Sequence, residues 1–275
     1  MRGVSTGPLL LLPWMLAATA CWEGAAVAGA AADGEWPAAH ILLDNEWVSI
    51  PPGSFLMGKQ GMAWSEPVHL VSLEAFQLTR TEITVAQYAA CVEDGACDPP
   101  AFLDENCNWD LADRDDHPIN CVTWNQAVAF CSRIDGRLPS ESEWEYAARS
   151  AGATSRYPWG EQDATCARAI MDGGGGLWAS GYGCGKMRTW DVCSKPEGNS
   201  AQGLCDLSGN VAEWVQDWFH PNYNGHPPDG SALEYPEGVS RVIRGGGFSL
   251  GAHHLLAAKR DYLPPGPLTG FRCAR

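Results

Sequence analysis

Residues 117–149 contain the clearest helical pattern of hydrophobic and polar positions in the chain. Thr123 is a suitable N-cap, and Asp135-Gly136 is a suitable stop. Between them, apolar residues recur at roughly helical spacing, which predicts a helix with one buried side formed by Trp124, Ala127, Val128 and Cys131.

A second helix is predicted directly after this one. Ser140-Glu141-Ser142-Glu143 has the pattern of a capping box, in which the serine hydroxyl and the glutamate carboxylate each satisfy a free backbone N–H group. Trp144, Ala147 and Ala148 then form the expected buried face. The segment therefore predicts a helix, a tight connection and a second helix, which is a scaffold rather than a site.

Short strands are predicted before these helices. From residue 47, apolar residues alternate with polar ones or stand in short runs, at Val48, Ile50, Phe55, Met57, Val68, Leu70, Val71 and Leu73. Thr84-Val-Ala-Gln87 is another capping box, and its helix is expected to end near residues 93–95, between the closely spaced Cys91 and Cys97.

The segment 157–204 has no sustained periodicity and is rich in Gly, Ser, Pro and Cys. We expect long loops here, held by disulfides rather than by regular secondary structure. Residues 104–116 carry six carboxylates, which could supply oxygen ligands for Ca²⁺, but their spacing favours a solvated acidic loop.

Composition narrows the functional classes. A chain of 275 residues, 45% of them hydrophobic and 19% charged, can bury a full core. The net charge of -15 opposes binding to nucleic acid and to anionic membrane surfaces. Eleven cysteines without a Cys-x-x-Cys pair favour an oxidising compartment over a zinc site.

The N-terminus reads as an export signal. Residues 1–20 have one basic residue, Arg2, and an apolar run too short to span a bilayer. Cleavage after Ala20 and lipidation of Cys21 are both compatible with this leader, and residues 21–44 read as a flexible tether. The chain is expected to be a bacterial protein that is exported to the periplasm or the extracellular space. A lipid on Cys21 would instead attach it to the outer membrane.

Several motifs downstream of residue 45 resemble the formylglycine-generating enzyme family, also called sulfatase-modifying factor domains. The resemblance covers residues 45–275 as one domain. It implies an α+β fold of the C-type-lectin-like kind, with little regular secondary structure. The motifs fall in the family's order: Ile50-Pro-Pro-Gly-Ser-Phe-Leu-Met-Gly58, Glu82-Ile-Thr84, Arg137-Leu-Pro-Ser-Glu-Ser-Glu-Trp-Glu-Tyr-Ala-Ala-Arg149, Tyr157-Pro-Trp-Gly160, Gly209-Asn-Val-Ala-Glu-Trp214, Arg244-Gly-Gly246 and Gly270-Phe-Arg-Cys273.

The chain departs from the family where the chemistry should be. In the enzymes that it resembles, two cysteines beyond an Arg-Gly-Gly-Ser strand bind copper and activate oxygen. Here Leu250 and Leu255 stand at those positions, and Gly247 replaces the serine. A leucine side chain offers no lone pair to Cu(I), so no copper is expected.

The resemblance also implies two disulfides of the family, of which this chain keeps the cysteines of one and lacks those of the other. The tie between the first helix and the C-terminal strand keeps both ends, as Cys131 and Cys273. The tie between the second helix and the segment after the copper cysteines loses both, at Ala148 and Arg260. Cys91 and Cys97 are a further expected pair, and nearest-neighbour pairing is expected for Cys107 with Cys121, Cys166 with Cys184, and Cys193 with Cys205.

The loop at residues 206–213 is the candidate metal site. Asp206 and Glu213 bracket a Gly-Asn turn, and Ca²⁺ takes carboxylate and carbonyl oxygens of this mixed kind. The resemblance implies that the carbonyls of Gly209 and Val211 complete a structural Ca²⁺ site. The alternative is that Glu213 simply pairs with a nearby arginine.

Three functions remain open at this stage. The first is an exported binding or structural module without copper oxidase activity, whose partner is an unknown protein, peptide or small molecule. It would present the surface around residues 250–260 and 157–204. The second is an enzyme of altered, copper-independent chemistry. Its acid and base groups would come from Glu141, Glu143, Asp206 and Asp217. The third is a true formylglycine-generating oxidase.

Overall fold

A computed structural model of the chain describes residues 45–101, 105–174, 181–262 and 269–275. The predicted leader (1–20), the lipidation candidate Cys21 and the tether (21–44) lie outside the described residues. Within the described ranges, no helix combines the length and the apolar character needed to cross a membrane.

The predicted N-terminal strands form two antiparallel pairs. One pair places residues 47–50 against 76–79, and the other places 53–57 against 69–73. Phe55 and Met57 point inward, whereas the alternate residues Ser54 and Leu56 are exposed. The strands are β1 (Trp47–Ile50), β2 (Gly53–Met57), β3 (His69–Leu73) and β4 (Phe76–Thr79).

All three predicted helices are present, and each begins with a complete capping box. In the first, Thr84 Oγ1 accepts from Gln87 N at 3.2 Å and Gln87 Oε1 accepts from Thr84 N at 2.9 Å. Thr123 with Gln126, and Ser140 with Glu143, repeat this arrangement. The helices are α2 (Val85–Glu93), α3 (Trp124–Arg133) and α4 (Glu141–Ala148).

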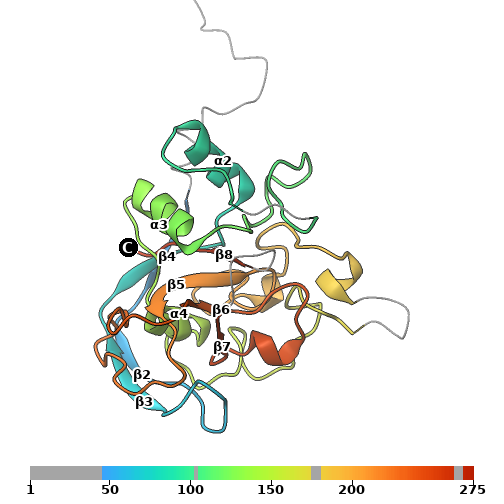
Figure 1. Cartoon of the computed structure of the whole chain (residues 1–275). Helices are drawn as coiled ribbons and strands as arrows, with labels where there is room; N and C mark the ends of the chain where they lie inside the picture. The colour runs from blue at the N-terminus through green and yellow to red at the C-terminus, as the bar shows by residue number, and fades with distance from the viewer. Residues whose placement is uncertain (1–44, 102–104, 175–180, 263–268) are drawn as a thin grey trace, which may run out of the picture. The chain divides into compact units, whose positions relative to one another are not determined.

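A four-stranded sheet in the order β7-β6-β5-β8 lies at the centre of the domain (Figure 1). Its core lies on both faces. Trp214 packs with the residues of α2 and α3, whereas Val215, the next residue along β5, packs with Trp144 of α4 and with β1 to β4. The strands are β5 (Ala212–Trp218), β6 (Arg241–Arg244), β7 (Arg260–Asp261) and β8 (Thr269–Phe271).

The segment between α4 and β5 is held by disulfides rather than by regular structure. Its described part contains only two short 3-10 helices, η1 (Tyr182–Gly185) and η2 (Pro196–Gly198). Five disulfides pair as predicted from the sequence: Cys91–Cys97, Cys107–Cys121, Cys131–Cys273, Cys166–Cys184 and Cys193–Cys205. The α+β fold with little regular structure and disulfide-held loops is therefore confirmed.

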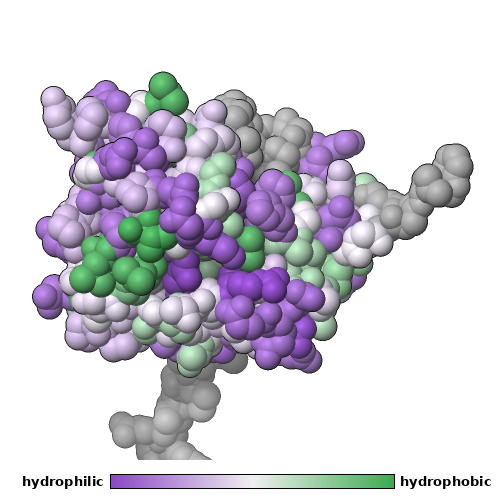
Figure 2. All heavy atoms as spheres, turned by 90° about the horizontal axis from the view of Figure 1, so that it is seen from below, coloured by the Kyte–Doolittle hydropathy of each residue, from purple (hydrophilic) through white to green (hydrophobic). Residues whose placement is uncertain are grey.

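One exposed apolar pair lies on the outer face of the β2–β3 hairpin. Leu56 and Leu70 are register partners, and they are 58% and 59% exposed. Figure 2 looks at the molecule from the side of this hairpin and shows one cluster of hydrophobic residues among mostly hydrophilic ones. An isolated pair of this size is ordinary for a protein surface.

Candidate functional site

The positions that match the copper cysteines lie in an apolar environment. Leu255 is fully buried on η3 (Ala252–Leu255), among side chains that include Tyr157 and Met171, and Leu250 packs against the same cluster. Ser208 Oγ donates to the Leu255 carbonyl at 2.8 Å, and Leu250 N donates to the Gly247 carbonyl at 2.9 Å. These positions form part of the core.

Little open space remains beside these leucines. The cavity that Leu250 and His254 help to line, together with Gly245 and Gly246, has a volume of about 20 Å³. A space of that size holds about one water molecule. All ten cysteines within the described ranges are in disulfides, so none of them offers a thiolate. The pair of thiolates that the copper mechanism of the family requires is therefore not available among the described residues.

The predicted calcium loop brings its two carboxylates into the interior. Both oxygens of Glu213 accept from Arg272 at 2.7 Å, from Nε and Nη2. Trp144 Nε1 donates to Glu213 at 2.8 Å, and the glutamate side chain is fully buried. The alternative interpretation of Glu213, an ion pair with a nearby arginine, is present in the structure.

Asp206 and a third carboxylate, Glu82, lie close to this ion pair. Asp206 Oδ2 accepts from Cys193 N at 2.6 Å. Burial raises the pKa of Asp206 to about 6, although the Cys193 N–H and the Arg272 charge act in the opposite direction. Burial, followed by the charges of Asp206 and Glu213, also raises the pKa of Glu82. Of the three buried carboxylates, Glu213 contacts the Arg272 guanidinium group directly, whereas Glu82 and Asp206 are influenced by its charge from nearby.

Glu82 is the residue of this site that the sequence reasoning did not select. Its carboxylate accepts from Val211 N at 3.0 Å and from Asn210 Nδ2 at 2.8 Å, so it holds the turn between Asp206 and Glu213. Glu82 stood in one of the family motifs, in Glu82-Ile-Thr84. That motif was the one signal that could have indicated it, because 124 residues separate Glu82 from Asp206 along the chain.

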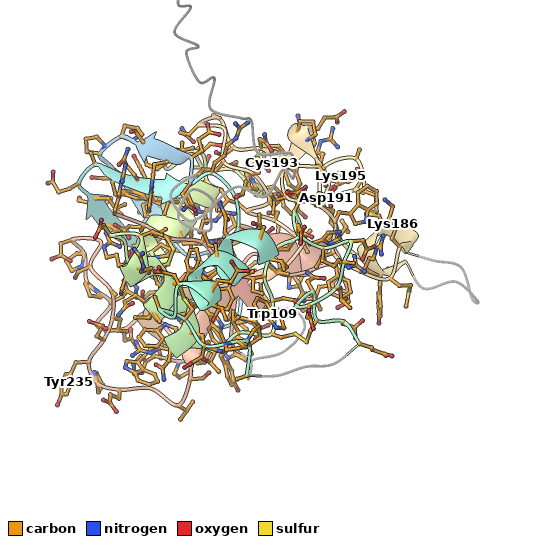
Figure 3. The ribbon with its side chains drawn as sticks, turned by 90° about the horizontal axis from the view of Figure 1, so that it is seen from above. Trp109, Lys186, Asp191, Cys193, Lys195 and Tyr235 are labelled. Atoms are coloured by element: carbon orange, nitrogen blue, oxygen red, sulfur yellow. A yellow bond between two sulfur atoms is a disulfide. The ribbon has the colours of Figure 1, made fainter. Side chains whose placement is uncertain are left out.

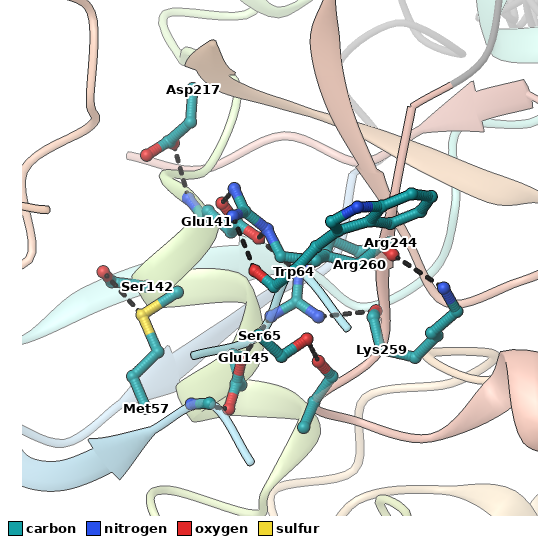
Figure 4. A network of polar contacts seen from close by, with 12 residues as sticks. Met57, Trp64, Ser65, Glu141, Ser142, Glu145, Asp217, Arg244, Lys259 and Arg260 are labelled. Atoms are coloured by element: carbon teal, nitrogen blue, oxygen red, sulfur yellow. Dashed lines mark hydrogen bonds and ion pairs between the residues drawn. The ribbon is translucent and has the colours of Figure 1, made fainter. Parts of the chain in front are cut away.

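Two of the candidate acid and base groups lie in a buried ionic network (Figure 4). Glu141 accepts from Arg260 Nε at 2.8 Å and from Nη2 at 2.6 Å, and Arg244 Nε lies 3.2 Å from the same carboxylate. Asp217 accepts from Glu141 N at 2.7 Å and from Leu233 N at 2.8 Å. These carboxylates hold α4, β5 and the C-terminal segment together.

Glu143 also has a structural position. It accepts from Arg137 at 2.6 and 2.7 Å and closes the capping box of α4. The resemblance aligns Arg260 with one cysteine of a disulfide that the family often forms with this helix. In this structure the Arg260 guanidinium group binds Glu141 of α4.

Among the described residues, one trio of ligand-type side chains has all its donor atoms within 4.8 Å: Glu141, Asp217 and His226. His226 Nε2 lies 3.4 Å from Asp217 Oδ1. Because Arg244 and Arg260 already contact Glu141, the negative charge of this trio is balanced without a metal ion. We therefore interpret the trio as part of the ionic network.

The acidic segment before α3 buries a histidine. His117 Nδ1 lies 2.7 Å from Thr189 Oγ1, and its Nε2 lies 3.3 Å from Arg114 Nη1 and 3.2 Å from Asp191. Burial, followed by the charge of Arg114, lowers the pKa of His117 to about 4. Asp104 lies outside the described residues.

The His117 environment gives a pH dependence with a definite sign. The unfolded chain takes up a proton on His117 near pH 6.5, whereas the folded chain does so only near pH 4. The free energy of unfolding therefore falls as the pH drops through this window, by at most about 2 to 3 kcal/mol. His117→Gln is expected to flatten that part of the stability profile in urea unfolding from pH 4 to 7. The control His253→Gln, at an exposed histidine, should show the same profile as the original protein. If His117→Gln also showed that profile, His117 would not be the cause of the pH dependence.

The sequence of the chain is similar to that of one known family. A family model described as "Sulfatase-modifying factor enzyme 1-like domain" matches residues 33–275. The formylglycine-generating enzyme of Streptomyces coelicolor is 30% identical over 309 residues, covering 91% of this chain and 95% of that protein.

Two solved structures are similar to the fold. The structure of PvdO from Pseudomonas aeruginosa matches with a TM-score of 0.70 at 26% identity, covering 84% of this chain and 94% of that one. Treponema denticola variable protein 1 matches with a TM-score of 0.62 at 22% identity, covering 83% and 94%, which shows a shared fold. With the family model spanning most of the chain, the conclusion is that this chain belongs to the sulfatase-modifying factor enzyme 1-like, or formylglycine-generating enzyme, family.

Proposed function

We propose that this chain is an exported member of the family that lacks the copper oxidase activity and acts as a binding or structural module. The observation that carries the proposal is the pair Leu250 and Leu255 at the positions of the copper cysteines. Leu255 is fully buried, and every described cysteine is in a disulfide. Soft thiolate ligands are what Cu(I) requires, and an apolar cluster supplies none.

Export is supported by the cysteine chemistry. Five disulfides in one domain form and persist in oxidising compartments and are rare in a reducing cytosol. The leader at residues 1–20 fits the same conclusion. We propose a periplasmic, outer-membrane or extracellular location, with a lipid on Cys21 as the one route to a membrane.

The loops around η1 and η2 are part of the proposed binding surface. Lys186 Nζ and Lys195 Nζ lie 3.7 and 4.0 Å from the Trp190 ring, which fixes both ammonium groups near one aromatic side chain. Figure 3 shows Lys186, Asp191, Cys193 and Lys195 on one side of the molecule, away from Tyr235. A protein, peptide or small molecule is the proposed ligand of this surface, and nucleic acid is disfavoured by the net charge of -15.

The test of the proposal is an activity assay. The purified, oxidised protein is incubated with Cu(I), oxygen, a reductant and a Cys-x-Pro-x-Arg peptide, and mass spectrometry follows conversion of the cysteine to an aldehyde. We expect no turnover above a metal-only blank. A double variant, Leu250→Cys with Leu255→Cys, is expected to gain Cu(I) binding. The control is Leu250→Ser with Leu255→Ser, which introduces side chains of similar size without a thiol and should not bind Cu(I). Turnover by the unmodified protein would overturn the proposal.

We also propose that Ca²⁺ binds at Asp206, Gly209, Val211 and Glu213. The support is the excess of buried negative charge, since Glu82, Asp206 and Glu213 face Arg272. Hard oxygen ligands suit Ca²⁺. In this arrangement both oxygens of Glu213 are held by Arg272, so calcium binding requires that ion pair to share or release them.

The calcium proposal predicts a melting temperature that rises with Ca²⁺ after treatment with a chelator. An ion that binds only the folded state stabilises it by about 2.7 kcal/mol at one hundred times its Kd. Thermal unfolding with and without Ca²⁺, together with metal analysis of the purified protein, measures this. Asp206→Asn should lose the response. An unchanged melt and no retained metal in the original protein would contradict the calcium proposal.

A further inference from the structure

A small cavity with a strongly cationic lining lies beside the C-terminal end of α4. Its volume is about 160 Å³, and Gly58, Lys59, Arg149, Thr154, Ser155, Arg156, Leu256 and Ala258 line it. Three of these eight residues carry a positive charge, and none carries a negative one. This concentration of positive charge contrasts with the whole chain, which has 18 Lys and Arg against 33 Asp and Glu.

Arg149 is fixed in the wall of the cavity. Its Nε donates to Glu145 at 2.9 Å, Nη1 donates to the Ser155 carbonyl at 3.3 Å, and Nη2 donates to the Gly58 carbonyl at 3.0 Å. These bonds use three of the five N–H donors of a guanidinium group, so two further donors are available for a ligand. The side chain is only 10% exposed, which makes it a rigid rather than a flexible cation.

Gly58 allows this arrangement of the backbone. It has φ +91°, and a Cβ atom there would lie 2.4 Å from the Ser65 carbonyl oxygen. With no side chain, Gly58 can donate its N–H to Glu145 at 2.9 Å and offer its carbonyl to Arg149. The wall of the cavity is therefore built by backbone geometry that a larger residue would disturb.

The Ser155 hydroxyl is a buried polar group without a hydrogen-bond partner among the described residues. Burying a hydroxyl without a hydrogen-bond partner costs free energy. A ligand that accepts a hydrogen bond from the hydroxyl would recover that cost. Ser155 lines the cavity next to Arg149 and Arg156. A negatively charged oxygen at this place would accept from the hydroxyl and from the guanidinium groups together.

No carboxylate is among the residues that line the cavity, although several lie near it. Glu145 lies behind Arg149 and also binds Arg244, which lies 3.2 Å from Glu141 as well. Glu161 accepts from Arg156 N at 2.9 Å on the exposed side. Arg156 Nη2 donates to Asp163 at 3.0 Å, but that carboxylate is 85% exposed, where water and salt weaken the pair. Lys59 is exposed and completes the positive rim.

We propose that this cavity binds an oxyanion, a phosphate or carboxylate group of a small ligand. Arg149, Arg156 and Lys59 would provide the charge, Ser155 the hydroxyl, and Leu256 with Ala258 an apolar wall for the rest of the molecule. The proposal rests on the binding role proposed above and gives that role a ligand chemistry. The two fail separately, since peptide turnover contradicts the binding role and loss of anion binding contradicts only this site.

The test is calorimetric titration of the purified full chain with inorganic phosphate and, in a second arm, with acetate, at pH 7 and low ionic strength. Saturable binding of either anion is the expected result, and the stronger arm identifies the class of oxyanion. Lys59→Glu and Ser155→Ala are expected to weaken it at least tenfold. Arg133→Glu has the same charge change as Lys59→Glu but lies at the end of α3, outside the cavity, so it should bind as the original protein does.

Two results would overturn the proposal. One is the absence of saturable binding to both anions. The other is binding that Lys59→Glu weakens no more than Arg133→Glu does, or that chloride reproduces at equal ionic strength, because either would reflect general charge screening. Lys59 and Ser155 are held through their backbone groups, which the substitutions leave in place, and thermal unfolding of each variant checks that it is folded.

Discussion

Replacing Arg244 by methionine is expected to destabilise the domain by about 3 to 5 kcal/mol, because it breaks a fully buried ionic network on one side. Arg244 pairs with Glu145 through Nη2 and lies 3.2 Å from Glu141 through Nε, and all three side chains are 0% exposed. Its Nη1 also donates to the carbonyls of Ala257 and Lys259, at 3.0 and 2.6 Å. Methionine has a comparable length but leaves these partners without a donor.

Chemical unfolding with the disulfides intact measures this effect. The matched control is Arg133→Met, since Arg133 pairs with Asp94 at 2.6 Å but both side chains are about 40% exposed. An exposed pair of this kind contributes at most about 1 kcal/mol. If Arg244→Met cost no more than the control, the network would not be what holds α4 to β6.

A second substitution separates the burial of charge from the loss of contacts. Combining Arg244→Met with Glu145→Gln removes a cation and an anion together, so less uncompensated charge remains buried. We expect the double variant to lose less stability than the sum of the two single changes. Additive losses would mean that the two side chains act independently, and they would contradict the coupling expected from their direct contact.

The sequence was most informative where the signal is local. Each helix start was visible as two residues three positions apart, such as Thr84 with Gln87 or Ser140 with Glu143, because a capping box closes over one turn. Nearest-neighbour disulfides such as Cys193–Cys205 were predictable for the same reason. They lie in loops without regular structure, where a close partner along the chain is also close in space.

The burial of α4 was not predictable from its own pattern. Trp144, Ala147 and Ala148 were the expected buried face, yet all eight residues of the helix are buried, its three glutamates included. The partners that make this tolerable, Arg244 and Arg260, lie 99 and 119 residues away from Glu145 and Glu141. A helical pattern read by polarity alone places carboxylates in solvent, because it contains no information on such distant cations.

The calcium loop shows the same limit. Asp206 and Glu213 were recognisable as carboxylates around a turn, but the arginine that holds Glu213 comes from the C-terminal strand, 59 residues later. Glu82 enters the same site from the segment before α2. Local spacing therefore drew attention to the loop, whereas the balance of charge around its carboxylates depends on two residues from elsewhere in the chain.

Removing the Cys131–Cys273 disulfide is expected to be among the most damaging changes to this domain. The bond closes a loop with a sequence separation of 142 residues, and it joins α3 to the C-terminal segment just after β8. On the entropic model, a cross-link of that length restricts the unfolded chain by about 5 kcal/mol. Both sulfur-bearing residues are fully buried, so Cys131→Ala with Cys273→Ala also leaves a small gap in the core.

The control for this prediction is the Cys91–Cys97 disulfide, with a sequence separation of 6 residues. The same model gives about 2 kcal/mol for so short a loop, because the entropic contribution grows with the logarithm of loop length. Chemical unfolding of the two double alanine variants should therefore differ by about 3 kcal/mol, with the long loop less stable. Equal losses would mean that disulfides act here through local packing. In that event the tie between α3 and the C-terminal strand would be no more important than the link that closes α2.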